Sequence, residues 1–122
     1  MWVDLAELLG IEVRRSDDEG ATARLVVDDR HLNRGGTVHG GLLATLVDVA
    51  MGATVFSGSE DDERPVTVEM KVNYLEAGDR GSLVATAKVR RRGGRFTVLE
   101  AEVEQNGVVL AFATGTYTTV PS

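Results

Sequence analysis

The chain contains no cysteine, has only two histidines and carries no familiar nucleophile or nucleotide motif. Without cysteine it can form no disulfide, thiolate metal site or cysteine nucleophile. The histidines, His31 and His39, lie in no compact cluster with acidic residues, so the sequence predicts no metal site. No serine lies in a Gly-x-Ser-x-Gly motif, and neither Gly-x-Gly-x-x-Gly nor Gly-Lys-Ser/Thr occurs. Serine hydrolase and nucleotide-binding functions are therefore not supported.

Basic residues are also scarce, since 13 Lys and Arg stand against 19 Asp and Glu and give a net charge of -6. Nucleic acids and anionic membranes are unexpected partners, because proteins that bind them normally carry a basic face. The most apolar window, Val38 to Phe56, is interrupted by polar residues and is unlike a membrane span. Met1 to Gly10 lacks the basic and long apolar parts of a signal peptide, so we expect a cytoplasmic protein.

The length and composition predict one folded domain over residues 1–122. The chain is 43% hydrophobic and 26% charged, which is ordinary for a globular protein. No internal repeat or shift in composition marks a boundary.

Hydrophobic periodicity predicts an α+β fold, in which a long antiparallel sheet wraps around one central apolar helix, about Val38–Ser57. A short helix, with Trp2 on its apolar face, is expected to end at Gly10. Polar segments at Ser16–Gly20 and Gly58–Pro65 are expected to be loops. The predicted strands are Ile11–Arg15, Ala21–Val27, Val66–Leu75, Ser82–Arg92, Phe96–Gln105 and Val108–Val120.

The last four predicted strands are expected to form a meander, with turns at Gly93-Gly94 and Asn106-Gly107. Strict alternation in Val66–Leu75 places Thr67 on the face opposite Val66 and Met70. Apolar residues at positions expected to face outward predict that a second copy covers the sheet; they are Val84, Leu99, Val103 and Val108.

Asp48 is the most unusual residue of the predicted central helix, because its neighbours are almost all apolar. It is either an ordinary carboxylate hydrogen-bonded at a groove or a functional group. On helical spacing it shares a stripe of small and polar residues with Gly41, Thr45 and Gly52. This stripe is suited to contact a partner helix or a substrate.

Glycines deliver flexible backbone to the start of this helix, in the segment Gly35 to Gly41. The first amides of a helix lack internal partners and lie at the positive end of its dipole, so they can bind an oxyanion. The alternative is that these glycines only permit close packing. Gly40 and Asp48 are eight residues apart, or about 12 Å on a straight helix, which is too far to act on one carbonyl. If they cooperate, two antiparallel copies of the helix must supply one group each.

The pattern Asn33-x2-Gly36-x2-His39-Gly40-Gly41-x6-Asp48 resembles the motif of hotdog-fold thioesterases of the phenylacetate-degradation (PaaI-type) branch. The segment Pro65 to Leu75 also resembles the strand that follows the helix in that family. The resemblance covers nearly the whole chain, although Arg34-Gly35 departs from the usual loop sequence.

The resemblance implies an acyl-CoA thioesterase that releases free acid and CoA without a metal or organic cofactor. The Gly40 amide would polarise the thioester carbonyl, while His39 and Asn33 shape the pocket. Asp48, from the opposite subunit of a homodimer, would act as general base or nucleophile, and the Thr67 hydroxyl would help to position water. The dimer is expected to pair again into a tetramer.

Contacts to CoA are predicted at Gly41 and at three consecutive arginines, Arg90, Arg91 and Arg92, whose guanidinium groups suit its phosphates. The arginines flank a predicted turn, and their alternative role is to solvate it or to pair with the acidic residues from Glu100 to Glu104. Two other functions also remain open, namely a hotdog enoyl-CoA hydratase or dehydratase and a non-catalytic acyl-CoA binding protein. The acyl group is not fixed by the sequence.

Overall fold

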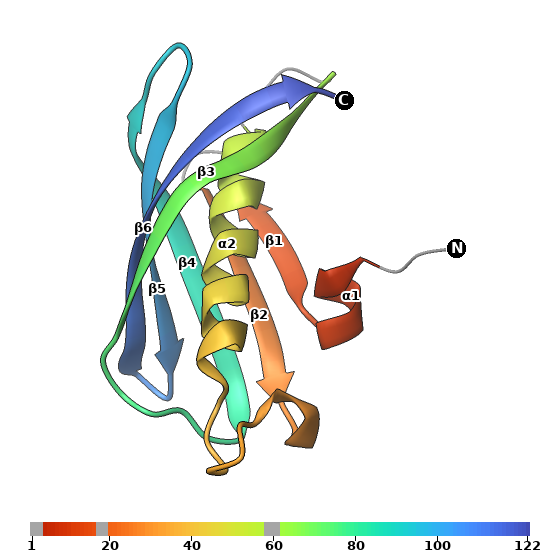
Figure 1. Ribbon diagram of the computed structural model, residues 1–122, viewed down its shortest axis with the longest axis vertical. Helices are drawn as coiled ribbons and strands as arrows, with labels where there is room; N and C mark the ends of the chain where they lie inside the picture. Colours follow the sequence, from red (N-terminus) through yellow and green to blue (C-terminus); the bar gives the residue numbers. More distant parts are fainter. Residues whose placement is uncertain (1–3, 17–19, 58–61) are drawn as a thin grey trace.

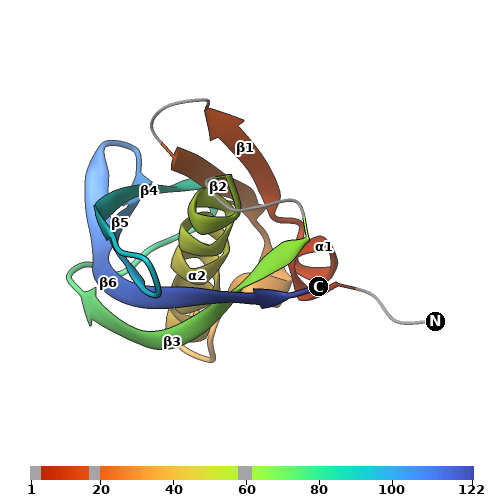
Figure 2. The same ribbon diagram turned by 90° about the horizontal axis from the view of Figure 1, so that it is seen from above.

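In the computed structural model, a six-stranded antiparallel sheet curls around one long helix, α2 (Gly40–Ser57) (Figures 1 and 2). The structure describes residues 4–16, 20–57 and 62–122. The strand order is β1-β2-β4-β5-β6-β3, so β1 and β3 form the two edges. The other elements are α1 (Leu5–Leu9), β1 (Glu12–Ser16), β2 (Gly20–Val27), η1 (Asp29–His31), β3 (Glu63–Tyr74), β4 (Gly81–Arg92), β5 (Thr97–Gln105) and β6 (Val108–Pro121).

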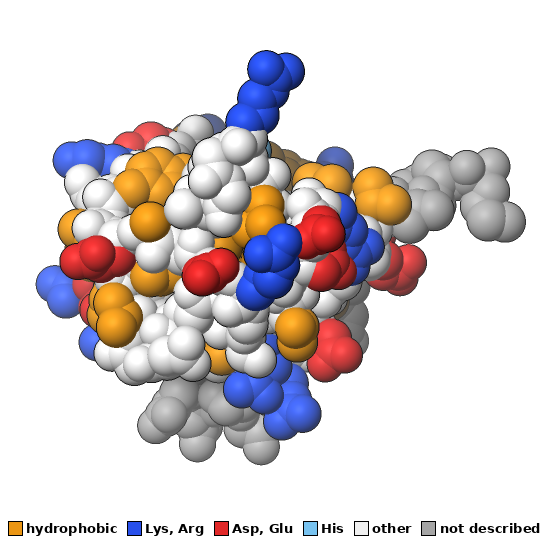
Figure 3. Space-filling model, turned by 90° about the horizontal axis from the view of Figure 1, so that it is seen from below, with side chains coloured by type: hydrophobic (Ala, Val, Ile, Leu, Met, Phe, Trp, Pro, Cys, Tyr) orange, Lys and Arg blue, Asp and Glu red, His pale blue; other side chains and the backbone are white. Residues whose placement is uncertain are grey.

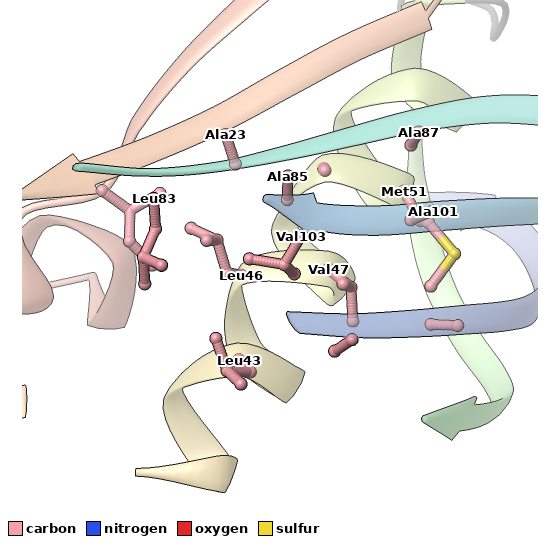
Figure 4. Close-up of a cluster of buried hydrophobic side chains, with 14 of the residues drawn as sticks. Ala23, Leu43, Leu46, Val47, Met51, Leu83, Ala85, Ala87, Ala101 and Val103 are labelled. Carbon is pink, nitrogen blue, oxygen red and sulfur yellow. The ribbon is translucent and has the colours of Figure 1, made fainter. Parts of the chain in front are cut away.

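The core lies between α2 and the concave face of the sheet (Figure 4). Leu46, Val47 and Met51 of α2 are fully buried against the strands. Many strand residues that face them are alanines, and their small side chains allow the helix to approach the sheet closely. The buried strand alanines are Ala21, Ala23, Ala85, Ala87, Ala101, Ala111 and Ala113. The predicted α+β architecture is confirmed, and the helix starts two residues later than expected.

The predicted meander is only partly right, because β3 pairs with β6 at the edge of the sheet instead of neighbouring β4. The hairpins β4–β5 and β5–β6 form as expected. The connection 75–80 crosses the end of the sheet beneath β6 and β5 (Figure 1). Three strand spacings amount to about 14 Å, which six extended residues can span.

β3 also begins at Glu63, inside the predicted loop. Trp2 and parts of both predicted loops lie outside the described residues.

The prediction that Leu99 and Val103 face outward is wrong, since both are completely buried against α2. The alternate positions of β5 carry Glu100, Glu102 and Glu104, and these charged residues take the solvent side. Of the four residues expected outside, Val84 is half-buried and Val108 is 50% exposed.

The face on which Thr67 lies was also predicted wrongly. A bulge between Thr67 and Glu69 adds one residue to β3 relative to β6, so the alternation changes phase at Val68. Thr67 lies opposite Tyr117 and Met70 lies opposite Gly115. Directly opposed residues share a face, so Thr67 and Met70 both point toward the helix side of the sheet.

The short helix α1 ends at Gly10, as the sequence predicted, and Gly10 adopts a left-handed conformation with φ 81°. None of the helices in the described parts of the chain combines the length and apolar character needed to cross a membrane.

Candidate active site

The backbone amides at the start of α2 differ in whether they meet an acceptor. His39 caps the helix, because its Nδ1 accepts a hydrogen bond from the Gly41 N–H at 2.9 Å. The His39 carbonyl accepts from Leu42 and Leu43 at 2.9 and 3.3 Å. Within residues 4–16, 20–57 and 62–122, no acceptor meets the N–H of Gly40. In this part of the chain, the amide left without an acceptor at the helix start is therefore that of Gly40, the residue to which the resemblance gives the role of polarising the carbonyl.

A cavity of about 350 Å³ opens beside Gly40. Its lining includes the apolar side chains of Val38, Leu43 and Leu75, together with the ring of Tyr74. The Tyr74 hydroxyl donates to the Gly40 carbonyl oxygen at 2.9 Å, which fixes the orientation of the first peptide of the helix. The cavity can hold the apolar part of a ligand while a polar group of the same ligand lies near the Gly40 amide.

Asn33 builds the loop that leads into the helix. Its side-chain oxygen accepts from the N–H groups of Gly35 and Thr37 at 2.9 and 3.2 Å, and its amide nitrogen donates to the Thr37 hydroxyl at 3.0 Å. These bonds form an Asx-type turn that positions the backbone before His39. Asn33 therefore acts on the helix start through the loop.

Asp48 lies half-buried near the middle of α2, and hydroxyl groups from two strands hold its side chain. Thr67 of β3 donates to Asp48 Oδ1 at 2.8 Å, and the Tyr117 hydroxyl of β6 donates to the same oxygen. In the described parts of the chain, no donor reaches the other carboxylate oxygen, Oδ2. The two carboxylate oxygens are therefore held differently.

Tyr117 was missed by the sequence reasoning, although a signal for it exists. It continues the inward-facing set of small residues on β6, namely Ala111, Ala113 and Gly115. A tyrosine on a buried face needs a hydrogen-bond partner for its hydroxyl. The Asp48 carboxylate on the central helix was an acceptor to which the sequence had assigned no donor. Burial, followed by the hydrogen bond to Asp48, raises the pKa of Tyr117 well above its ordinary value.

The second histidine, His31, has a structural role. It is buried, its Nδ1 accepts from the Asp28 N–H at 2.9 Å, and its Nε2 lies 2.8 Å from the Leu9 carbonyl oxygen. These partners assign the neutral tautomer with the proton on Nε2. His31 thereby ties the end of α1 to the loop before α2.

The sequence family described as the thioesterase superfamily matches residues 35–112, which is more than half of the chain. The chain belongs to the thioesterase superfamily. The matched segment contains Gly40, Asp48 and Thr67, and the helix wrapped by a sheet is the hotdog fold. This protein is a thioester hydrolase.

Similar proteins support the assignment over nearly the whole chain. The structure of the conserved protein PA5202 from Pseudomonas aeruginosa has a TM-score of 0.91 and 37% identity, and covers 98% of this chain and 96% of that one. The BH2602 protein from Bacillus halodurans, crystallised with CoA, has a TM-score of 0.91 and 32% identity, covering 99% and 81%. The medium/long-chain acyl-CoA thioesterase YigI of Salmonella typhimurium is 29% identical, over 89% of this chain and 81% of its own length.

The thioesterase structure does not bring all the predicted site residues together. Gly40 and Asp48 lie on one continuous helix, about 12 Å apart along its axis. The arginines at positions 90–92 lie near the tip of the β4–β5 hairpin, toward the opposite end of α2 from Gly40 (Figure 1). At the end where α2 begins, Lys and Arg side chains are scattered among apolar and acidic ones and form no single basic patch (Figure 3).

The raised pKa of Tyr117 predicts that its hydroxyl stays protonated in the folded thioesterase at pH values where an unfolded tyrosine ionises, about 10. The folded state then holds a proton that the unfolded state has lost. Stability conferred by this group is fully present below pH 10 and is lost as the pH rises above it, by about 1.4 kcal/mol per pH unit.

Alkaline titration of Tyr74→Phe, which leaves Tyr117 as the sole tyrosine, measures this directly. Tyrosinate absorbance is expected to appear only together with the loss of secondary structure. Ionisation near pH 10 in a protein that retains its fold would show that the hydroxyl is not held by Asp48 as described.

Proposed function

We propose that this thioesterase hydrolyses an acyl-CoA or aryl-acyl-CoA to free acid and CoA, at two equivalent sites in a homodimer. The observation that carries the proposal is the Asp48 carboxylate, which is held at one oxygen by Thr67 and Tyr117, while no donor from the described residues reaches the other. The free Gly40 amide supplies the second requirement, a donor for the carbonyl oxygen. The motif from Asn33 to Asp48 supports the narrower placement in the phenylacetate-type branch.

The distance between the two groups supports a site shared by two subunits. On one helix they are about 12 Å apart, whereas the attacking water and the carbonyl oxygen must lie within a few ångströms of one carbon. The half-buried residues Thr45 and Asp48 and the exposed Gly41 lie along the side of α2 that the sheet leaves uncovered. β3 beside them is a free edge, and its Val68 is 52% exposed. Antiparallel pairing of two such helices would bring Asp48 of one near Gly40 of the other.

In the proposed reaction, the carbonyl oxygen of the thioester accepts a hydrogen bond from the Gly40 N–H. Asp48 Oδ2 of the other subunit takes a proton from water as the water oxygen forms a bond to the carbonyl carbon. The tetrahedral intermediate then expels the CoA sulfur as the C–S bond breaks, and the leaving thiolate takes that proton from Asp48. Asp48 therefore acts as general base, and the reaction needs no metal or organic cofactor.

The cavity beside Gly40 would receive one arm of the substrate, and the arginine cluster Arg90–Arg92 would meet the phosphates of CoA. Antiparallel pairing turns this cluster of one subunit toward the end that carries the Gly40 of its partner. Arg90 lies 3.6 Å from Glu100, which also pairs with Lys88 at 3.2 Å. Arg91 and Arg92 are exposed, so their guanidinium groups are the better candidates for phosphate.

We further propose that two dimers pair through the outer face of the sheet. This face carries exposed apolar residues among charged ones, with Val26 67% and Val98 38% exposed. Their burial would stabilise the tetramer.

Asp48→Asn tests the proposed function, because asparagine keeps the shape of the side chain but accepts no proton. Release of CoA from a panel of aryl and aliphatic acyl-CoAs is followed with a thiol reagent, which the chain itself cannot consume because it has no cysteine. We expect kcat to fall by about a thousandfold, as for loss of a general base. Turnover by Asp48→Asn close to that of the parent on every substrate would contradict the mechanism. Hydration of an enoyl-CoA by the parent would favour the hydratase or dehydratase. Binding of acyl-CoA without turnover would favour the non-catalytic binding protein.

Gly40→Pro tests the amide, because proline removes the N–H at a first helical position, where its ring is tolerated. Gly40→Ala is the matched control: it keeps the N–H, and its Cβ would meet the Tyr74 ring at 3.4 Å. We expect kcat to fall by about a hundredfold more in Gly40→Pro than in Gly40→Ala. Equal kcat values in the two variants, both folded by circular dichroism, would remove Gly40 from the mechanism.

A further inference from the structure

We infer that Tyr117 is a positioning residue for hydrolysis, whose hydroxyl fixes the Asp48 carboxylate so that only Oδ2 is presented to water. The inference rests on the proposed function and extends it to a residue outside the motif. Tyr117 acts through Asp48, since its hydroxyl bonds to Oδ1, the oxygen that does not take the proton.

The ring of Tyr117 is held rigidly between β6 and α2. The residue is 1% exposed and its hydroxyl also lies 3.3 Å from the backbone oxygen of Asp48. Gly115 leaves space for this packing, since a Cβ there would lie 3.0 Å from both the Tyr117 ring and Met51 Cε. A Cβ at Gly52 would lie 3.9 Å from the other side of the ring. The hydroxyl is therefore delivered to one place by a side chain that has little freedom to move.

The two donors to Asp48 differ in their exposure. Thr67 is exposed, so its hydroxyl can also accept a hydrogen bond from water while it donates to the carboxylate. Tyr117 is closed off from solvent and has no such second role. We assign the permanent anchoring of Oδ1 to Tyr117 and the contact with the reacting water to Thr67.

The register of β3 and β6 supports this division of roles. Thr67 and Tyr117 are direct partners across the strand pair, and the bulge follows immediately after Thr67. Bulges re-aim side chains and often lie beside active sites. Here the bulge lets Thr67 reach Asp48 while Met70 still faces the core, so two hydroxyls converge on one oxygen.

Tyr117→Phe is the direct test, because it removes only the hydroxyl. We expect kcat for CoA release to fall about tenfold to a hundredfold, with KM changed by less than about twofold, because a misplaced catalytic group slows the chemical step. Thr54→Val is the matched control. It removes another buried hydroxyl of the same fold, bonded to the Ala50 carbonyl oxygen at 2.8 Å and to the Ala21 N–H at 2.9 Å, without contact to Asp48. It should lower Tm and leave kcat unchanged.

A double variant separates action through Asp48 from any other effect. In the Asp48→Asn background, Tyr117→Phe should cause no further loss of kcat. A further tenfold loss there, or a kcat of Tyr117→Phe within about twofold of the parent, would overturn the inference. If Tyr117→Phe kept the kcat of the parent while Asp48→Asn was inactive, the inference about Tyr117 would fail and the proposed function would stand.

Crystal structures of the parent and of Tyr117→Phe give a readout that does not depend on turnover. The Asp48 carboxylate should leave its position or occupy more than one rotamer in the variant. An unchanged carboxylate would overturn the inference. If the parent hydrolysed no acyl-CoA, the proposed function would fail, and a displaced carboxylate would still support the anchoring of Asp48 by Tyr117.

Discussion

The hydrogen bonding of one half-buried carboxylate connects most features of this fold. Asp48 is the one charged residue of a helix whose other side chains are mostly apolar, and such a group is tolerated only when donors satisfy it. Its donors come from β3 and β6, which pair with each other at the edge of the sheet. The curl of the sheet around α2, the bulge in β3 and the alanines beneath the helix all determine where those donors lie. The carboxylate is thus oriented by the tertiary structure, with one oxygen bound and the other without a donor in the described parts of the chain.

The second constraint is the rise of the helix. A straight helix separates Gly40 from Asp48 by about 12 Å, so no side-chain rearrangement within one subunit can bring the amide and the carboxylate to the same carbonyl. The small and polar residues along α2 and the open edge of β3 offer a surface for a second copy of the chain. By symmetry, each copy would then supply the group that the other cannot bring to its own site. In that arrangement each helix contributes its beginning to one site and its middle to the other.

Local signals in the sequence predicted the parts of the fold that depend on neighbouring residues. The apolar run that became α2, the Asn106-Gly107 hairpin and the end of α1 at Gly10 were all expected from residue type and spacing. The place of β3 was not, because its pairing with β6 joins segments far apart in the chain, and alternation alone says nothing about which strands become neighbours. The inward direction of Leu99 follows from the glutamates on the other face of β5, which the apolar pattern alone did not weigh.

The sequence reached only part of the candidate site. Among the described residues the Gly40 amide meets no acceptor, and Asp48 has two hydroxyl partners, one of them Thr67. The catalytic roles that the motif resemblance gives to these residues stay predictions. Strict alternation would have turned the Thr67 side chain away from Asp48. The bulge in β3 turns it toward Asp48, and no residue type in the sequence predicts that bulge. Tyr117 lies fifty residues beyond Thr67 and enters the site through strand register alone.

The sharing of each site between subunits, with Gly40 from one and Asp48 from the other, can be tested in mixed dimers. Subunits carrying Gly40→Pro and subunits carrying Asp48→Asn are given different affinity tags, co-expressed and purified as heterodimers. Such a heterodimer has one site with both groups intact and one with neither. We predict that its kcat per dimer is about half that of the parent, although each homodimer is nearly inactive. A heterodimer no more active than the two variant homodimers would contradict the shared site.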